Sequence, residues 1–331
     1  SNVEWMGWLW LVCDVAIIVW DCEAWHLLTA RQVSVARDAG ALVVLSAALN
    51  AYSIVLAWRG DSAAATALIA EREEIVEAVG SPAHLHPFGA LHLAAWQGDE
   101  ARATALIKSS LPTAVSRGVG LAVASTQWVS AVLYNGLGRY GEALAAAQQA
   151  SEHGQELWYP WILPELIEAA ARSGQSARAA RALDLLAETT RAVGTDWALG
   201  TEARSRALLA RDEVAEDLYR EAVNRLGRTG LRIEQARAHL LYGEWLRRQR
   251  RRGDARDQLR AAYEIFVSAG AGAFAERART ELRATGEHAP KRNAETRDAL
   301  TARESHIARM GANDRTLLIS GYGMCEGLIP R

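Results

Sequence analysis

The sequence predicts an all-α fold, a right-handed helical solenoid of about seven helix hairpins from the N-terminus to about Gly286. Three observations predict it. A helix–turn–helix pattern recurs about every 38 residues. Only 7 of the 331 residues are proline, and Ala, Leu, Arg and Glu are abundant, which favours helix almost everywhere. Half of the residues are apolar and 23% are charged, a composition typical of a globular protein rather than a disordered one.

The repeat can be followed through six segments, each with an apolar helix, a short turn and a second helix. Successive turns are 38, 40, 36, 38 and 38 residues apart, and composition alone does not produce such spacing. The turn positions are Gly60, Gly98, Gly138, Gly174, Asp212 and Arg250. A glycine at this point ends the first helix in the left-handed conformation. Because each hairpin leaves one apolar face open, stacking against the next hairpin closes the core.

Small and bulky residues follow each turn at fixed distances. An alanine five positions after the turn lets the second helix approach the first closely, as at Ala65, Ala103, Ala143 and Ala179. A bulky residue four positions further on fills the interface with the next repeat, as at Ile69, Ile107 and Leu183. These side chains therefore define the packed face of each second helix.

The segment 138–150 resembles a tetratricopeptide repeat, because Gly138, Tyr140, Ala143 and Ala150 stand where that motif has Gly, Tyr, Ala and Ala. In tetratricopeptide arrays the first helices line a concave groove. The resemblance implies an aromatic-lined groove for an effector small molecule or a protein partner. Its candidate residues are Asn50, Trp58, Phe88, His92, Trp96, Trp128, Asn135, Glu168 and Arg172. The alternative is that these tryptophans form the core between repeats, since Trp is more often packed than functional.

The C-terminal third carries a second resemblance. The run His239–Glu287 is followed by a polar stretch and then by a set of residues that matches the pattern L-T-x-x-E-x-x-I-A: Leu300, Thr301, Glu304, Ile307 and Ala308. This order resembles the C-terminal half of large ATP-binding LuxR-type transcriptional regulators, which join a P-loop ATPase, a tetratricopeptide-like array and a helix-turn-helix. The resemblance implies that this chain is the sensor and interaction region of such a regulator.

Two parts of that architecture have no counterpart in the sequence. No G-x-x-x-x-G-K-[ST] motif occurs, so no cofactor is expected in this chain and ATP is implied only for the full-length family. The helix-turn-helix gives way to a glycine-rich tail, so DNA would be bound only through a complete helix-turn-helix. We expect a repeat domain at 1–286, a linker at 287–298, and a truncated or frameshifted start of the LuxR-type helix-turn-helix at 299–331.

Charge is divided unevenly along the chain. Residues 1–200 hold 12 Lys and Arg against 20 Asp and Glu, whereas residues 201–331 hold 25 against 19. The most basic run consists of Arg247, Arg248, Arg250, Arg251 and Arg252. These arginines either contact phosphates or form a solvated face at a helix C-terminus, where the helix dipole favours them. We favour the solvated face.

The residue pattern does not predict an enzyme. The sequence has no D-D-x-x-D cluster and no G-x-S-x-G motif. His84, His86 and His92 lack a cysteine or a paired carboxylate, so a solvated loop is a better interpretation than a metal site. The alternative to the regulator is a stand-alone tetratricopeptide-repeat adaptor for protein–protein interaction, and self-association is compatible with either function.

The cysteines and the apolar N-terminal run bear on location. Cys13, Cys22 and Cys325 are scattered and form no C-x-x-C pair, which favours a reducing compartment and a cytoplasmic protein. The stretch Trp5–Trp20 is shorter than the roughly 20 residues that a bilayer requires, and Asp14 interrupts it. We therefore expect a buried helix there and no membrane association.

Overall fold

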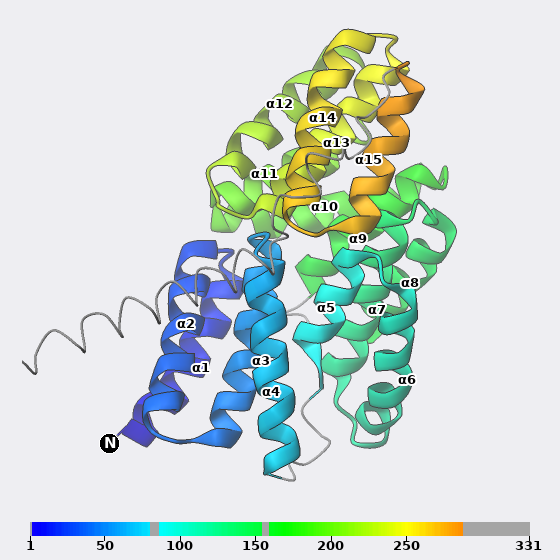
Figure 1. Cartoon of the computed structure of the whole chain (residues 1–331). Helices are drawn as coiled ribbons and strands as arrows, with labels where there is room; N and C mark the ends of the chain where they lie inside the picture. Colours follow the sequence, from blue (N-terminus) through cyan, green and yellow to red (C-terminus); the bar gives the residue numbers. More distant parts are fainter. Residues whose placement is uncertain (1, 80–85, 154–158, 287–331) are drawn as a thin grey trace, which may run out of the picture. The chain divides into compact units, whose positions relative to one another are not determined.

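The computed structural model describes residues 2–79, 86–153 and 159–286, and within these ranges the chain forms fifteen α-helices and no β-strand (Figure 1). The prediction of an all-α fold is confirmed. The helices are α1 (Asn2–Ile18), α2 (Cys22–Asp38), α3 (Leu42–Trp58), α4 (Ser62–Ala78), α5 (Phe88–Gln97), α6 (Glu100–Ser116), α7 (Gly120–Gly136), α8 (Tyr140–His153), α9 (Tyr159–Arg172), α10 (Ser176–Val193), α11 (Asp196–Ala207), α12 (Asp212–Gly227), α13 (Arg232–Arg248), α14 (Arg252–Ser268) and α15 (Gly272–Ala284). The expected linker and the start of the helix-turn-helix, residues 287–331, lie outside the described residues.

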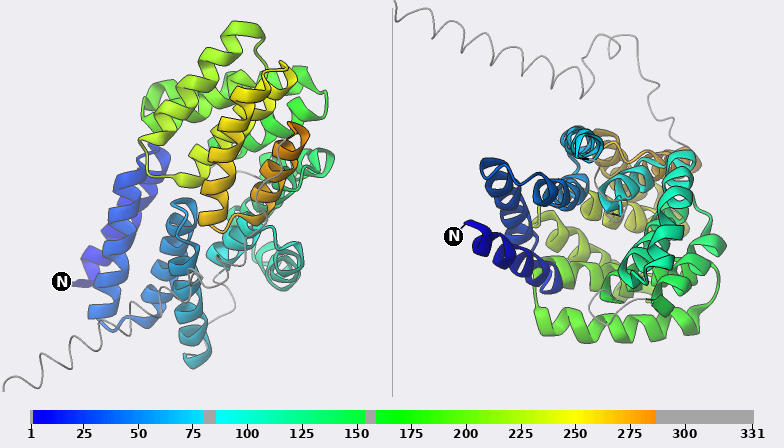
Figure 2. Two further views of the ribbon diagram at one scale, coloured as in Figure 1. Left: turned by 45° about the horizontal axis from the view of Figure 1, so that its top comes forward. Right: turned by 90° about the horizontal axis from the view of Figure 1, so that it is seen from below.

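The helices form an inner and an outer layer. Each helix packs against the next along the chain, and the odd-numbered helices from α3 to α13 also pack against one another. The even-numbered helices pack only against the helix before and the helix after them in the chain, which places them on the outside. Seen from below, α1 to α10 wind around a common centre (Figure 2). Side chains on the inner helices therefore point toward positions that several repeats share.

The turns inside the hairpins have the geometry that the sequence predicts. Gly60, Gly98, Gly138 and Gly174 have φ of 82, 76, 72 and 74°. Where Asp follows the turn it caps the second helix: Asp61 accepts a hydrogen bond from the N–H of Ala64 at 3.0 Å. The alanines five positions after these turns, Ala65, Ala103, Ala143 and Ala179, are all at most 1% exposed. Local sequence thus sets where each hairpin bends and how closely its helices pack.

The fifth turn differs from the expectation. Asp212 is the first residue of α12, and the chain turns at residues 208–211. The buried Ala215 corresponds to Ala65 of the earlier hairpin, so the position equivalent to Gly60 is Ala210. No glycine marks this turn, so the local sequence does not fix its position. Arg250 does occupy a turn, and its φ of 63° is the same left-handed conformation that glycine adopts at the earlier turns.

The last helices pack against early ones. The described contacts join α15 to α5 and α7, and α13 to α3. At Gly98 an added Cβ would lie 2.8 Å from the backbone nitrogen of Ala273, at the start of α15. An added Cβ at Gly136 would lie 2.8 Å from the ring of Phe274. Glycine at these two positions lets the end of the array fold back onto α5 and α7.

A tryptophan cluster occupies the centre of the inner layer. Trp58, at the end of α3, has ring-to-ring contacts of 5.4–6.2 Å with five other tryptophans. They are Trp25, Trp96, Trp128, Trp161 and Trp197. Trp20 stacks on Trp161 at 4.4 Å, although its φ of 53° is unusual for a bulky residue. Five inter-helix contacts from this one indole therefore join α3 to α2, α5, α7, α9 and α11.

The N-terminal helix is buried on one side only. In α1, Cys13 and Ala16 are buried, whereas Trp8, Leu11, Val12 and Val15 are 63, 54, 44 and 48% exposed. The expectation of a buried helix over Trp5–Trp20 is therefore wrong for its outer face. The reason is that α1 is the first helix and packs mainly against α2, so no described helix covers its other side. None of the helices in the described ranges combines the length and the hydrophobicity needed to cross a lipid bilayer.

Candidate ligand-binding site

A cavity of about 320 Å³ lies between α1, α2, α3, α5, α7 and the start of α9. Its volume falls in the range of pockets that hold small organic molecules. The lining is formed by Trp10, Asp14, Ile17, Trp25, Ala47, Asn50, Ala51, Ile54, Trp58, Phe88, His92, Leu121, Ala124, Ser125, Trp128, Trp161 and Ile162. Six of these residues carry indole or phenyl rings, so the cavity is strongly aromatic.

The ring positions follow from the helices that carry them. Trp25 stands in the first turn of α2 and Trp161 in the first turn of α9, whereas Trp58 ends α3. Trp128, on α7, stacks on Trp58 at 5.8 Å and lies 4.7 Å from the imidazole of His92. These contacts hold the indole faces rigidly around one space, which reduces the entropy that a ligand would have to remove on binding.

Two of the polar residues in the lining already have partners. Asn50 donates its amide to the carbonyl of His86 at 2.9 Å and accepts from the N–H of Gly89 at 2.9 Å. Nδ1 of His92 contacts the carbonyl of Phe88 at 2.7 Å. Asn50 and His92 therefore position the start of α5. Burial lowers the pKa of His92 to about 4, so its imidazole is neutral at pH 7.

Asp14 gives the cavity its charge. Its carboxylate lines the cavity and remains exposed to solvent, which places it at the opening. The described residues include no Lys or Arg in this lining. Partial burial raises the pKa of Asp14 above its ordinary value. The site thus combines one carboxylate with aromatic walls.

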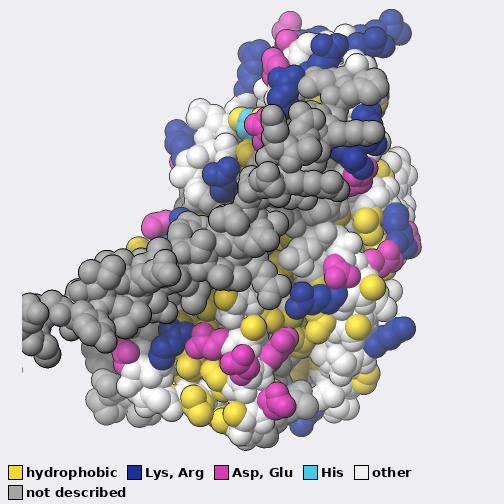
Figure 3. All heavy atoms as spheres, in the orientation of Figure 1, with side chains coloured by type: hydrophobic (Ala, Val, Ile, Leu, Met, Phe, Trp, Pro, Cys, Tyr) yellow, Lys and Arg dark blue, Asp and Glu magenta, His cyan; other side chains and the backbone are white. Residues whose placement is uncertain are grey.

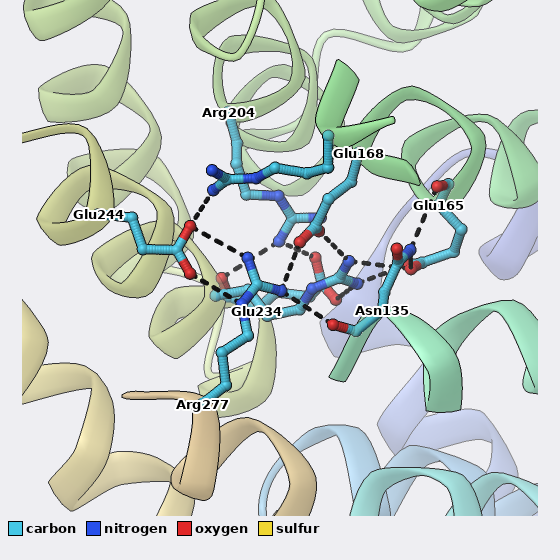
Figure 4. Close-up of polar contacts among 9 residues, drawn as sticks. Asn135, Glu165, Glu168, Arg204, Glu234, Glu244 and Arg277 are labelled. Atoms are coloured by element: carbon cyan, nitrogen blue, oxygen red, sulfur yellow. Dashed lines mark hydrogen bonds and ion pairs between the residues drawn. The ribbon is translucent and has the colours of Figure 1, made fainter. Parts of the chain in front are cut away.

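A network of buried ion pairs adjoins the tryptophan cluster (Figure 4). Arg237 of α13 contacts Glu165 at 2.5 Å and Glu168 at 2.8 Å, both on α9. Arg277 of α15 contacts Glu168 at 2.7 Å and Glu244 at 2.7 Å. The remaining members are Asn135, Arg172, Arg204 and Glu234. The network therefore joins α7, α9, α11, α13 and α15.

The charges in this network balance, with four arginines and four glutamates. Their side chains are 2–8% exposed, apart from Arg172 at 15%. Burial by itself would raise the pKa of Glu168, but attraction by Arg277, Arg237 and Arg172 outweighs burial and holds that pKa below its usual range. Such a balanced set fixes the relative positions of helices more than it adds net stability.

The structure divides the nine groove candidates between these two places. Asn50, Trp58, Phe88, His92 and Trp128 line the cavity, whereas Asn135, Glu168 and Arg172 belong to the ion-pair network. Trp96 lies between them: its ring contacts Trp58, and the Arg237 guanidinium lies 5.8 Å from the ring centroid. Seven of the nine are buried, so they lie inside the array rather than on an open groove.

Sequence reasoning missed several residues at both places. In the cavity these are Trp10, Asp14, Trp25 and Trp161; in the network they are Glu165, Arg204, Glu234, Arg237, Glu244 and Arg277. One local signal was available. Glu165 and Glu168, and likewise Glu234 and Arg237, are three residues apart on otherwise inward-facing helices, so each pair shares a buried face.

The arginine run around the α13–α14 turn is partly engaged. Arg247 pairs with Glu281 at 2.5 Å, and Arg251 pairs with Glu216 at 2.6 Å. Arg248, Arg250 and Arg252 are exposed. Figure 3 shows Lys and Arg side chains gathered over the helices α12–α15, with acidic side chains among them. At least two of the five arginines are thus occupied by carboxylates.

The prediction of a solvated loop is wrong for His86, which precedes α5. His86 is 6% exposed, and its Nε2 lies 3.1 Å from the Thr126 hydroxyl, so it does not belong to a solvated loop. The local sequence has no apolar period there, whereas the contact with α7 is tertiary. His84 lies outside the described residues. In the described ranges no three His, Cys, Asp or Glu side chains are placed to hold a metal ion.

Comparison with protein-family models and with curated proteins gives no match to this sequence. The LuxR-type resemblance rests on residues of the C-terminal third, chiefly Leu300, Thr301, Glu304, Ile307 and Ala308. Function is therefore inferred from the cavity, the ion-pair network and the helices that they share.

Proposed function

We propose that this chain is the sensor and interaction region of a LuxR-type transcriptional regulator, and that its aromatic cavity receives a small-molecule effector. The helices are interpreted as a tetratricopeptide-like right-handed solenoid of about seven hairpins whose last helices fold back on α3, α5 and α7. The chain itself carries out no catalysis. ATP binding and base reading belong to family domains for which this sequence has no complete motif.

The observation that carries the proposal is the cavity of about 320 Å³ with tryptophans on several walls. Large apolar pockets with a few polar groups are the usual binding sites for small ligands. The packed cluster around Trp58 leaves this space open although the surrounding rings are in contact. A cavity of this size in a core that is otherwise closely packed supports a ligand-binding role.

A route from the cavity to the far helices supports the relay. Trp128 lines the cavity on α7, and Asn135 lies two turns further along the same helix in the ion-pair network. On α9, Ile162 lines the cavity and Glu165 follows one turn later in the network. Because α7 and α9 are shared, a ligand that shifts either helix changes the contacts of Arg237 and Arg277. Those contacts hold α13 and α15.

Filling the cavity tests the sensor function. We expect Ala51→Leu to occupy the space without removing any tryptophan, since Ala51 lines the cavity and is half-buried. The matched control is Ala67→Leu, at an exposed position on α4. Compounds that raise the Tm of the wild-type chain should lose that effect in Ala51→Leu and keep it in Ala67→Leu. Loss in neither variant or in both would contradict an effector site in this cavity.

The coding DNA tests the regulator assignment. An ATPase sequence with a P-loop in frame before the codon for Ser1 would support it, as would an intact recognition helix in another frame after Met310. An independent start codon with no ATPase sequence upstream would favour the adaptor instead.

One observation favours the adaptor as the second candidate. The outer face of α1 exposes Trp8, Leu11, Val12 and Val15, and Val19 beyond its end is 40% exposed. Contiguous apolar side chains of this kind mark protein-docking surfaces. An adaptor would use that face, whereas the sensor uses the cavity on the opposite, inner side of α1. Trp8→Ser should then weaken partner binding while leaving effector binding unchanged.

A further inference from the structure

We propose that the cavity binds an organic monocation with an apolar or aromatic body, such as a quaternary ammonium compound. The inference rests on the proposed sensor function for the location of the site and adds the chemical class of the ligand. Three features of the lining carry it: its charge, the state of its aromatic faces, and the polar groups that remain available.

The charge of the lining is negative. Asp14 contributes a carboxylate at the opening, and none of the described residues forms an ion pair or a hydrogen bond with it. The lining has no Lys or Arg among the described residues, and His92 is neutral at pH 7. Anionic ligands would therefore meet repulsion at the opening, whereas a cation would supply the counter-charge that Asp14 lacks.

Among the described residues, no cationic side chain lies over the aromatic faces in the cavity. Arg237 lies over the rings of Trp96 and Phe274, at 5.8 and 5.3 Å from the centroids. Neither of those rings lines the cavity. No guanidinium lies over the described rings that line the cavity, among them Trp25, Trp58 and Trp128. Trp faces attract cations most strongly of all side chains, and several such faces around one space form an aromatic cage.

The available hydrogen-bonding groups disfavour a sugar or another polyhydroxylated ligand. The amide of Asn50 is used by the backbone of His86 and Gly89, and Nδ1 of His92 is used by Phe88. Ser125 carries the one hydroxyl among the described lining residues, and the other open donors there are the buried indole N–H groups of Trp58 and Trp128. A buried sugar would leave most of its hydroxyls without partners, and each unmade hydrogen bond opposes binding. A quaternary ammonium group requires no hydrogen-bond partner.

Four probes, of which the first three have similar sizes, separate the ligand classes on the full chain. Benzyltrimethylammonium is the cation, neopentylbenzene is its uncharged carbon isostere, phenylacetate is the anion, and trehalose is the neutral sugar. Binding is followed by calorimetry and by quenching of tryptophan fluorescence. We expect the cation to bind at least about tenfold more tightly than the isostere. No binding of the cation up to millimolar concentration, or equal binding of the isostere, would overturn the inference.

Substitutions then locate the interaction. Asp14→Asn should weaken cation binding about tenfold and leave binding of neopentylbenzene unchanged. Asp38→Asn, at an exposed aspartate at the end of α2, is the matched control and should change neither. Ala51→Leu should abolish binding of both probes. Cation binding that survives Ala51→Leu, or that is insensitive to Asp14→Asn, would show surface attraction and refute the proposal.

The two proposals fail in different ways. If trehalose or neopentylbenzene binds best and Ala51→Leu removes that binding, the sensor function stands and the cation specificity is wrong. If the cation binds in the cavity but the upstream coding DNA lacks an ATPase sequence, the ligand class stands and the regulator assignment is wrong.

Discussion

Arg277 of α15 donates Nη1 to Oε1 of Glu168 of α9 at 2.7 Å, and the two residues are 109 positions apart in the sequence. Both side chains are at most 8% exposed. The same guanidinium contacts Glu244 of α13 and the backbone carbonyl of Asn135 at the end of α7. One side chain of the last described helix therefore joins three inner helices at the centre of the array.

Removing this guanidinium should loosen the end of the array. We expect Arg277→Ala to lower the free energy of unfolding by roughly 3–5 kcal/mol, because Glu168 and Glu244 would stay buried with less compensation. Urea unfolding measures the loss, and hydrogen exchange should show α15 deprotected first. The control is Arg283→Ala, exposed in the last turn of α15, with an expected effect of less than about 1 kcal/mol. Equal effects of the two substitutions would contradict a central role for Arg277.

Gly98 should tolerate a side chain less well than other turn glycines. Its φ is 76°, and an added Cβ would also lie 2.8 Å from the nitrogen of Ala273. Gly174 has a φ of 74° and no atom within 4 Å of an added Cβ. We expect Gly174→Ala to cost about 1 kcal/mol, the penalty for left-handed backbone, and Gly98→Ala at least about 2 kcal/mol. Equal losses in urea unfolding would mean that α15 does not pack on this turn.

Mild acid should destabilise the protein through two buried histidines. Burial lowers the pKa of His86 and of His92 from an ordinary 6.5 to about 4. The unfolded chain therefore binds protons that the folded chain does not, so this part of the stability is complete above pH 6.5 and is lost as pH falls toward 4. At pH 5 the loss is about 2 kcal/mol for each histidine.

The measurement for that effect is the urea midpoint at pH 7 and at pH 5. His92→Gln should lose about half of the difference between the two midpoints, since His86 remains. A difference that is unchanged by this substitution would show that other groups, and not the buried imidazoles, bind the protons.

The turn at Arg250 offers a stabilising change. Arg250 is exposed and has a φ of 63°, which costs a side chain roughly 1 kcal/mol relative to glycine. Arg250→Gly should therefore raise the stability by about that amount, seen as a higher Tm. Arg248→Gly, inside the last turn of α13, should instead lower it by a similar amount. A lower Tm for Arg250→Gly would show that the arginine side chain makes a contact that outweighs its backbone strain.

Much of the helical framework could be predicted from the sequence because it depends on neighbouring residues. Gly60, Gly98, Gly138 and Gly174 mark turns through their own backbone preference, and the alanines that follow are buried as their spacing indicates. The prediction failed at Asp212, because no glycine marks the turn at residues 208–211. It also failed on the outer face of α1, where no further described helix covers the apolar side chains.

The inner side of the array was predicted only as a row of candidate positions. Which candidates line a cavity and which form ion pairs depends on how α13 and α15 return to α3, α5 and α7. Asp14 and Trp161 meet at one cavity although 147 positions separate them, and no local pattern encodes that distance. The sequence by itself determined the helices, their turns and their buried faces, since these follow from backbone preference and side-chain period over a few residues. Tertiary structure decided where polar and aromatic side chains converge, because small rotations between hairpins add up along the chain before α13 and α15 meet the earlier helices.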